Sequence, residues 1–135
     1  MASLSAIRDG IKTRLATISG LETYDTMPDT ANPPCAIVGV PARIEYDVTF
    51  RNAVARYEIP VRVFAGRVAE SDSQDRLDGY ISPDGLTSLR GAIDGDPTLG
   101  GVAHTVRVTE ARDYGVYTLG DVPYIGVEIV CEVIG

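Results

Sequence analysis

The chain has 135 residues, a length typical of one domain that can bury a core of its own. A hydrophobic share of 44% and a charged share of 23% are ordinary for a globular domain. The apolar runs of about four or five residues are far shorter than the roughly 20 that a membrane helix needs. The net charge of −7 argues against a grip on nucleic acid through counterion release. We therefore expect a single domain, residues 1–135, that is made in a cytosol and has no membrane partner.

The clearest predicted helix covers residues 3–19. Apolar residues recur there at steps of three and four, so they form one stripe along the helix. The stripe consists of Leu4, Ile7, Ile11, Leu15 and Ile18. Ser3 or Ser5 can cap its start, and Gly20 stands where a left-handed residue often ends a helix. Residues 21–34 hold three prolines and no helical stripe, so they predict a surface loop.

A predicted strand and a predicted hairpin follow. The strand is expected at residues 35–40. Residues 43–50 and 55–65 alternate between apolar and polar side chains around a short polar turn at 51–52, which is typical of a β-hairpin. Pro60 lies inside the second run and cannot donate a backbone hydrogen bond, so we expect one edge of that strand to be unpaired.

Two short helices and a turn-rich segment are expected next. Ser71 and Gln74 have the spacing of a capping box, and the helix they begin should end by Gly79. The serine–proline pair at 82–83 predicts the start of a second helix. The inner side of that second helix is predicted to carry Leu86, Leu89 and Ile93. Residues 94–101, DGDPTLGG, form a turn cluster that lacks the pattern of a phosphate-binding loop.

The last segment predicts a long hairpin with its turn at residues 119–121 and a bulge near Gly115. The inward face of its second strand should carry Ile125, Val127, Ile129, Cys131 and Val133, while Glu128 and Glu132 point the other way. The element order is α-β-β-β-α-α-β-β. It predicts an α+β fold, a mainly antiparallel sheet of about four to five strands with two to three flanking helices.

The sequence offers little catalytic or metal-binding chemistry. His104 is the only histidine and stands among valines, where a structural role is typical. Cys35 and Cys131 are far apart and predict small buried hydrophobic residues rather than a zinc site. Asp94 and Asp96 flank a glycine, but the other ligands of a calcium loop are missing. Three acids at helical spacing predict a solvated stripe, namely Asp72, Asp75 and Asp78. We therefore expect no catalytic residue, no metal site and no cofactor.

Tyrosine is the main aromatic residue, with seven Tyr, two Phe and no Trp. Its large ring and polar hydroxyl suit protein interfaces. We predict that interface contacts are made by tyrosines and by residues around the turn of the central hairpin. These candidates are Tyr46, Phe50, Arg51, Asn52, Tyr57, Tyr114 and Tyr117.

An ordered string of motifs runs through the C-terminal half. It consists of Gly79-Tyr80, Ser88-Leu89-Arg90, DPTLGG at 96–101, Arg107-Val108-Thr109, Asp113-Tyr114-Gly115 and the strand from Tyr124 to Val133. Over about residues 75–135 this string resembles the tail terminator proteins of long-tailed phages of actinobacterial hosts. The N-terminal helix, loop and central hairpin agree with that family only in order and length.

The resemblance implies a structural protein of the virion, located at the head-proximal end of the tail. It implies a hexameric ring of identical subunits that stops polymerisation of the tube and presents a surface to the head. The partners implied are other copies of the chain, the major tail tube protein and the head–tail connector protein, with DNA only passing through. In such a ring Glu128 and Glu132 are candidates for channel-facing or solvent-facing acids.

Two alternatives remain open from the sequence. The first is another phage neck or tail-completion adaptor of similar size and charge. The second belongs to a different class, a small α+β ligand-binding domain or enzyme, which would need polar groups converging in a pocket.

Overall fold

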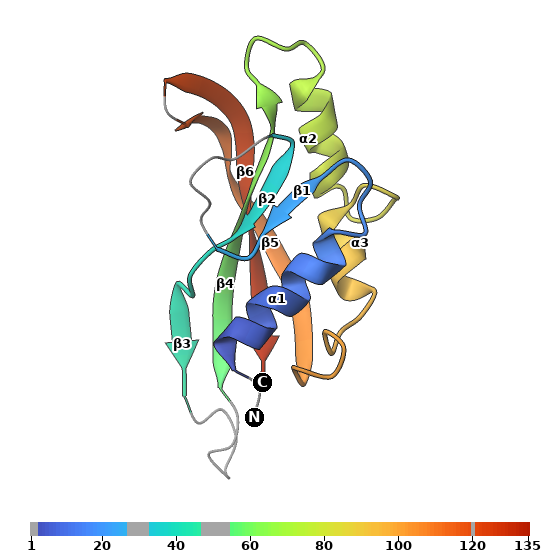
Figure 1. Ribbon diagram of the computed structural model, residues 1–135, viewed down its shortest axis with the longest axis vertical. Coiled ribbons are helices and arrows are strands. Elements are labelled where there is room, and N and C mark those ends of the chain that lie inside the picture. The colour runs from blue at the N-terminus through green and yellow to red at the C-terminus, as the bar shows by residue number, and fades with distance from the viewer. Residues whose placement is uncertain (1–2, 27–32, 47–54, 120) are drawn as a thin grey trace.

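The computed structural model describes residues 3–26, 33–46, 55–119 and 121–135. In these residues three helices lie on one face of a mixed six-stranded sheet, which confirms the predicted α+β class (Figure 1). The elements are α1 (Leu4–Leu15), β1 (Glu22–Tyr24), β2 (Cys35–Val38), β3 (Arg43–Glu45), β4 (Arg56–Arg67), α2 (Ser73–Ile81), α3 (Leu89–Asp94), β5 (Thr105–Leu119) and β6 (Val122–Ile134).

The strands follow the order β1-β2-β4-β6-β5, and β3 pairs with β4 on the same side as β2. All pairings are antiparallel except that of β1 with β2. The long strands β4, β6 and β5 form the centre and one side of the sheet, and the short strands lie on the other side (Figure 1). The closing hairpin is thus joined to the rest of the fold through β6.

The main core lies between the sheet and the helices. The predicted stripe of α1 is confirmed, because Ile7, Ile11 and Leu15 are fully buried. They meet the inward side chains of the central strands, which include Tyr57, Ile59, Val61 and Val63 of β4 and Val127, Ile129, Cys131 and Val133 of β6. The period-two pattern of both strands therefore gave the correct inward face.

The expectation that Pro60 marks an unpaired edge is wrong. Strand β4 is central, with β6 on one side and β2 and β3 on the other. The carbonyl of Pro60 accepts a hydrogen bond from the Gly39 N–H at 2.8 Å, so Pro60 faces the break between β2 and β3. A missing N–H removes no ladder hydrogen bond at such a break, and the proline is tolerated there.

Two features of the N-terminal region differ from expectation. Helix α1 ends at Leu15 and a turn follows it, whereas the predicted helix extended to residue 19. The predicted cap at its start is confirmed, because the Ser3 hydroxyl accepts a hydrogen bond from the Ala6 N–H at 3.1 Å. Gly20 has the expected left-handed backbone, with φ of 80°. The predicted loop at 21–34 contains strand β1, which is too short to leave a periodic pattern.

Helix α2 begins close to the predicted start near Ser71 but ends at Ile81 rather than by Gly79, and α3 begins later than predicted. Helix α2 begins at Ser73 behind Asp72, which makes no side-chain capping bond, so the capping box at Ser71 is absent. Helix α3 begins at Leu89, where the Ser88 hydroxyl accepts a hydrogen bond from the Gly91 N–H. The serine–proline pair at 82–83 belongs to the preceding loop, and Leu86 is 98% exposed rather than on an inner face. Leu89 and Ile93 are buried as expected.

The closing hairpin agrees with the prediction. Leu119 pairs with Val122, which fixes the turn, and the register shifts between Arg112 and Gly115, where a bulge was expected. A further shift lies between Val108 and Glu110. On the first side of the central hairpin, β3 covers Arg43–Glu45, and the rest of the predicted strand and its turn, residues 47–54, lie outside the described part of the chain.

Candidate functional site

The face of the sheet opposite the helices carries charged side chains in alternating positions. Those of β4 follow directly from its pattern, because Arg56, Glu58 and Arg62 alternate with core residues. Strand pairing adds charged residues from β3, β5 and β6 on the same face. With Glu22 of β1, which stands opposite Cys35, the registers place on this face Arg43, Arg56, Arg62, Arg67, Arg107 and Arg112 with Glu22, Glu45, Glu58, Glu110, Glu128 and Glu132. We call this surface the charged face.

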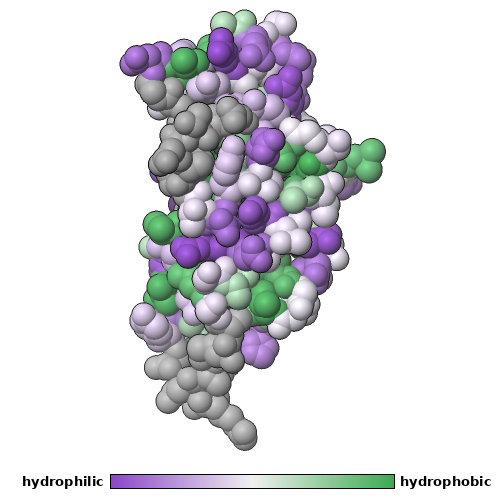
Figure 2. Space-filling model, viewed as in Figure 1, coloured by the Kyte–Doolittle hydropathy of each residue, from purple (hydrophilic) through white to green (hydrophobic). Residues whose placement is uncertain are grey.

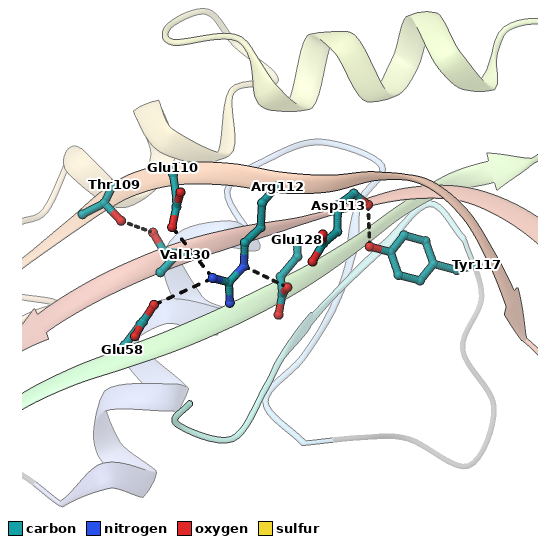
Figure 3. A network of polar contacts seen from close by, with 8 residues as sticks. All are labelled: Glu58, Thr109, Glu110, Arg112, Asp113, Tyr117, Glu128 and Val130. Carbon is teal, nitrogen blue, oxygen red and sulfur yellow. Dashed lines mark hydrogen bonds and ion pairs between the residues drawn. The ribbon is translucent and has the colours of Figure 1, made fainter. Parts of the chain in front are cut away.

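Arg112 of β5 is the centre of this network. Its Nε donates a hydrogen bond to Glu128 Oε2 at 3.2 Å, and its Nη1 lies 3.8 Å from Glu110 and 4.0 Å from Glu58 (Figure 3). The hydrogen bond to Glu128 and the nearby negative charges raise the pKa of the Arg112 guanidinium. One cation thus joins β5, β6 and β4, three strands that are adjacent in the sheet.

Arg56, at the start of β4, likewise joins neighbouring strands of the charged face. Its Nη1 is 3.2 Å from Glu45 on β3, and its Nε is 3.7 Å from Glu132 on β6. Glu58 and Glu132 stand directly opposite each other, a like-charge pair that would be unfavourable by itself. The neighbouring arginines offset this repulsion. Around them lies a shallow hollow of about 240 Å³, lined by Arg43, Glu45, Arg56, Glu58 and Glu132 with Thr109 and Val130.

The two candidate channel acids belong to this balanced set. Glu128 and Glu132 do point away from the core, as expected, but each faces an arginine. The Glu128 side chain is only 12% exposed. Six arginines and six glutamates cancel on the charged face, so the net charge of −7 comes from residues outside it. These two acids therefore offer little free negative charge on the isolated chain.

Surplus acid is found on the helix side. Asp75 and Asp78 of α2 are exposed, and the Tyr114 hydroxyl donates a hydrogen bond to Asp78 Oδ1 at 2.9 Å. Partial burial, together with that carboxylate, raises the pKa of Tyr114. Arg76 lies between these acids but is held by Asp72 and by the Ala65 carbonyl. Figure 2 shows hydrophilic residues spread over this face, with smaller apolar patches between them.

The structure scatters the other predicted interface residues. Tyr46 is 73% exposed beside β3, whereas Tyr57 is 9% exposed and packs in the main core. Tyr114 is 40% exposed at the bulge of β5. The remaining three candidates, Phe50, Arg51 and Asn52, lie outside the described residues.

Tyr117 belongs to a small second cluster on the charged face, near the tip of the closing hairpin. Its buried members are Cys35, Ile37 and Phe64, and the partly buried ones are Tyr24, Tyr117 and Tyr124. The Tyr117 hydroxyl donates to the Asp113 carbonyl at 2.6 Å, which ties the ring to the β5 bulge (Figure 3). This cluster holds the tips of β4, β5 and β6 together.

Both cysteines are buried free thiols, as predicted. Cys131 lies in the main core and Cys35 in the second cluster, so the sheet separates them. Burial raises the pKa of Cys131 to about 12 and that of Cys35 to about 11. His104 is exposed before β5, where its backbone N–H donates to the Ile134 carbonyl. No group of three or more metal-ligating side chains gathers in the described residues.

Sequence reasoning missed the charged face. It found the acids of β6 but not their arginines, which stand on strands that are distant in sequence. The signal that was present is the period-two spacing of Arg56, Glu58 and Arg62 opposite a known core face. Opposite charges at matched positions on candidate neighbouring strands would have indicated the pairing.

The amino-acid sequence matches no protein-family model and no curated protein. Among the helices that the structure describes, none is both long enough and apolar enough to span a bilayer.

Proposed function

We propose that the protein is a tail terminator of a long-tailed phage, a virion component that caps the tail tube as a ring of six subunits. In this role it stops polymerisation of the tube and forms the joining surface for the head connector. The observation that carries the proposal is the ordered resemblance over residues 75–135. That stretch corresponds to α2, α3, β5 and β6, one continuous part of the fold.

The α+β architecture supports the proposal because it agrees with the fold that the resemblance implies. The charge distribution adds a second support. An acidic surface lets DNA pass without adhering to it. Asp75 and Asp78 on α2 are better candidates for that surface than Glu128 and Glu132, whose charges are balanced by Arg112 and Arg56.

Deletion of the gene from the phage tests the proposal. We expect tails of irregular, excessive length that carry no head, and restoration of regular tails when the wild-type gene is supplied in trans. Negative-stain electron microscopy measures the length distribution. As a control, a complementing gene that carries Leu86→Ser should restore tails of regular length as well as the wild-type gene does, because the Leu86 side chain is 98% exposed in a loop.

The same experiment separates the terminator from a neck adaptor. Loss of an adaptor leaves tails of normal length that fail to join heads, since the tube has already been capped. Tails of normal length in the deletion strain would overturn the proposal, whether or not heads are attached. Labelling of purified tails should place the protein at the head-proximal end, and a label elsewhere would also refute it.

A further inference from the structure

Three strands are edges of the described sheet, because each has a described neighbour on one side only. They are β1, β3 and β5. Outward backbone groups of an edge strand can pair with another chain. Strand β5 is poorly suited to such pairing, since the Val106 N–H already donates to the Pro97 carbonyl and two register shifts interrupt the strand beyond it. Strand β3 has a continuous register along its whole length.

Exposed apolar side chains gather at β3. Val40 is 72% exposed, Ile44 is 38% exposed and Tyr46 is 73% exposed, all within seven positions of the chain. In Figure 1, β3 lies at the margin of the sheet, and none of the three helices passes over it. A free sheet edge that carries exposed apolar side chains is typical of an interaction surface.

The residues of β3 are complementary to themselves when one copy is read in the opposite direction. They are Arg43, Ile44 and Glu45, a cation, an apolar residue and an anion. Ile44 pairs with the core residue Tyr57 and lies on the helix side, whereas its two neighbours lie on the charged face. Two antiparallel copies of β3 centred on Ile44 would therefore place each Arg43 opposite a Glu45, and one Ile44 opposite the other.

Neighbouring registers lack this match. A centre on Arg43 or on Glu45 sets like charges opposite each other, which is unfavourable. A shift of one position sets side chains of the charged face against those of the helix side. In the register centred on Ile44, the exposed Tyr46 also comes next to Ala42 of the other copy.

The two charged residues of β3 are suited to a contact with another copy. The Arg43 side chain is 70% exposed, and its ion pair with Glu45 of the same strand is long, at 3.8 Å. Arg56 lies 3.2 Å from Glu45 and holds that carboxylate in place at the edge. An incoming cation would thus meet an anion whose position is already fixed.

We propose that the free protein forms a dimer in which the β3 edges of two copies pair antiparallel about a two-fold axis at Ile44. Arg43 of each copy contacts Glu45 of the other, so the contact is the same from both sides. The sheet continues from one copy into the next, and the exposed β3 edge is covered. The inference goes beyond the proposed function, because a two-fold contact joins only two copies, whereas the copies in a capping ring share one orientation.

Cysteine cross-linking tests the position of the axis. Residues directly opposite in an antiparallel pair have Cα atoms about 4.5–5.5 Å apart, within the range that a disulfide can bridge. Under mild oxidation, Ile44→Cys should therefore form a disulfide-linked dimer at least about tenfold faster than Leu86→Cys, an exposed position in the loop before α3. The native Cys35 and Cys131 thiols are buried and should contribute little background.

Arg43→Cys is the matched control on the same strand. In the proposed register the two copies of position 43 are diagonal neighbours, about 7–8 Å apart, which is too far for a disulfide. Arg43→Cys alone should therefore cross-link slowly, and its mixture with Glu45→Cys should cross-link rapidly. Cross-linking of Ile44→Cys that is no faster than that of Leu86→Cys and Arg43→Cys would overturn the inference.

Charge reversal gives an independent measurement. Arg43→Glu alone sets like charges across the axis, and so does Glu45→Arg, so each should raise the dimer dissociation constant at least about tenfold. When the two variants are mixed, a cation meets an anion at both positions, and the dimer should return. Light scattering measures the mass, and circular dichroism checks that both variants remain folded. A wild-type protein that stays monomeric at the highest attainable concentration would refute the dimer, as would a mixture no more associated than its components.

These outcomes are separate from those of the proposed function. Cross-linking through Ile44→Cys with normal tails in the deletion strain would retain the dimer and reject the terminator. Overlong tails with a monomeric free protein would retain the terminator and reject the dimer.

Discussion

The ring of Phe64 on β4 packs edge to face against the ring of Tyr117 on β5, with centroids 5.5 Å apart and planes at 80°. Strand β6 runs between these two strands, and the rings meet over it at Gly126. A Cβ at Gly126 would lie 2.9 Å from Phe64 Cδ1 and 3.0 Å from Tyr117 Cδ2. The glycine therefore permits an aromatic pair that spans three strands, and the pair covers the glycine in return.

Gly126→Ala should lower the free energy of unfolding by about 1–3 kcal/mol, because the added methyl group overpacks this site. It would also lie 2.8 Å from the Val63 carbonyl oxygen, a backbone atom that cannot turn aside. Gly115 pairs directly with Gly126 but has no atom within 4 Å of an added Cβ, so it offers a matched control. Gly115→Ala should change stability by less than about 0.5 kcal/mol. Urea denaturation measures both, and equal losses would contradict the packing described.

Leu86 and Leu89 lie three positions apart, and truncation to alanine should lower the stability at Leu89 far more than at Leu86. Leu89→Ala removes a fully buried side chain and should cost about 2–5 kcal/mol. Leu86→Ala changes a side chain that is 98% exposed and should stay within about 0.5 kcal/mol. Thermal and urea unfolding provide the measurement. A large loss from Leu86→Ala would instead support the earlier helix start at 82–83.

The raised thiol pKa of Cys131 predicts a loss of stability in alkaline solution. Its ordinary pKa is 9.0 and the folded value is about 12, so between these limits the unfolded chain releases a proton that the folded chain retains. Stability is therefore unaffected by this group below pH 9 and falls as the pH rises toward 12, by at most about 1.4 kcal/mol per pH unit. Cys35 contributes similarly up to about pH 11.

Cys131→Ala isolates this effect. The variant should be less stable than the wild type at neutral pH, since it leaves a cavity in the core, but it should lose less stability per pH unit above pH 9. The tyrosines with raised pKa values remain in both proteins and cancel in the comparison. Identical slopes would show that the buried thiol does not resist ionisation.

Arg112 and Glu128 should be coupled more strongly than an exposed pair. A double-mutant cycle with Arg112→Gln and Glu128→Gln should give a favourable coupling energy, because Glu128 is only 12% exposed and the hydrogen bond is 3.2 Å long. The Arg90–Asp94 pair, on one exposed turn of α3, is the control and should couple by no more than about 0.5 kcal/mol. Urea denaturation at low and high salt checks both cycles. A cycle for Arg112 no larger than the control would show that the network does not stabilise the fold.

Much of the fold could be predicted where a pattern is long and repeats. The stripe of α1, the inward residues of β4 and β6, and the turn and bulge of the closing hairpin all follow from periodicity and turn residues. The capping signals of the later helices were predicted less well, because serine–proline and capping-box patterns also occur in loops, as residues 71 and 82–83 show. Strand β1 was not predicted, because three residues are too few to show a periodic pattern.

By itself, the sequence determined which side of each long strand is buried and that Glu128 and Glu132 point away from the core. Alternation along one strand is a local property, so it needs no knowledge of the neighbours. Only the tertiary structure decided that Arg112 and Arg56 stand beside those acids, that Pro60 lies in a central strand, and that β1, β3 and β5 are the edge strands of the described sheet. Each of these depends on strand order and register, which bring together residues that are far apart in the chain.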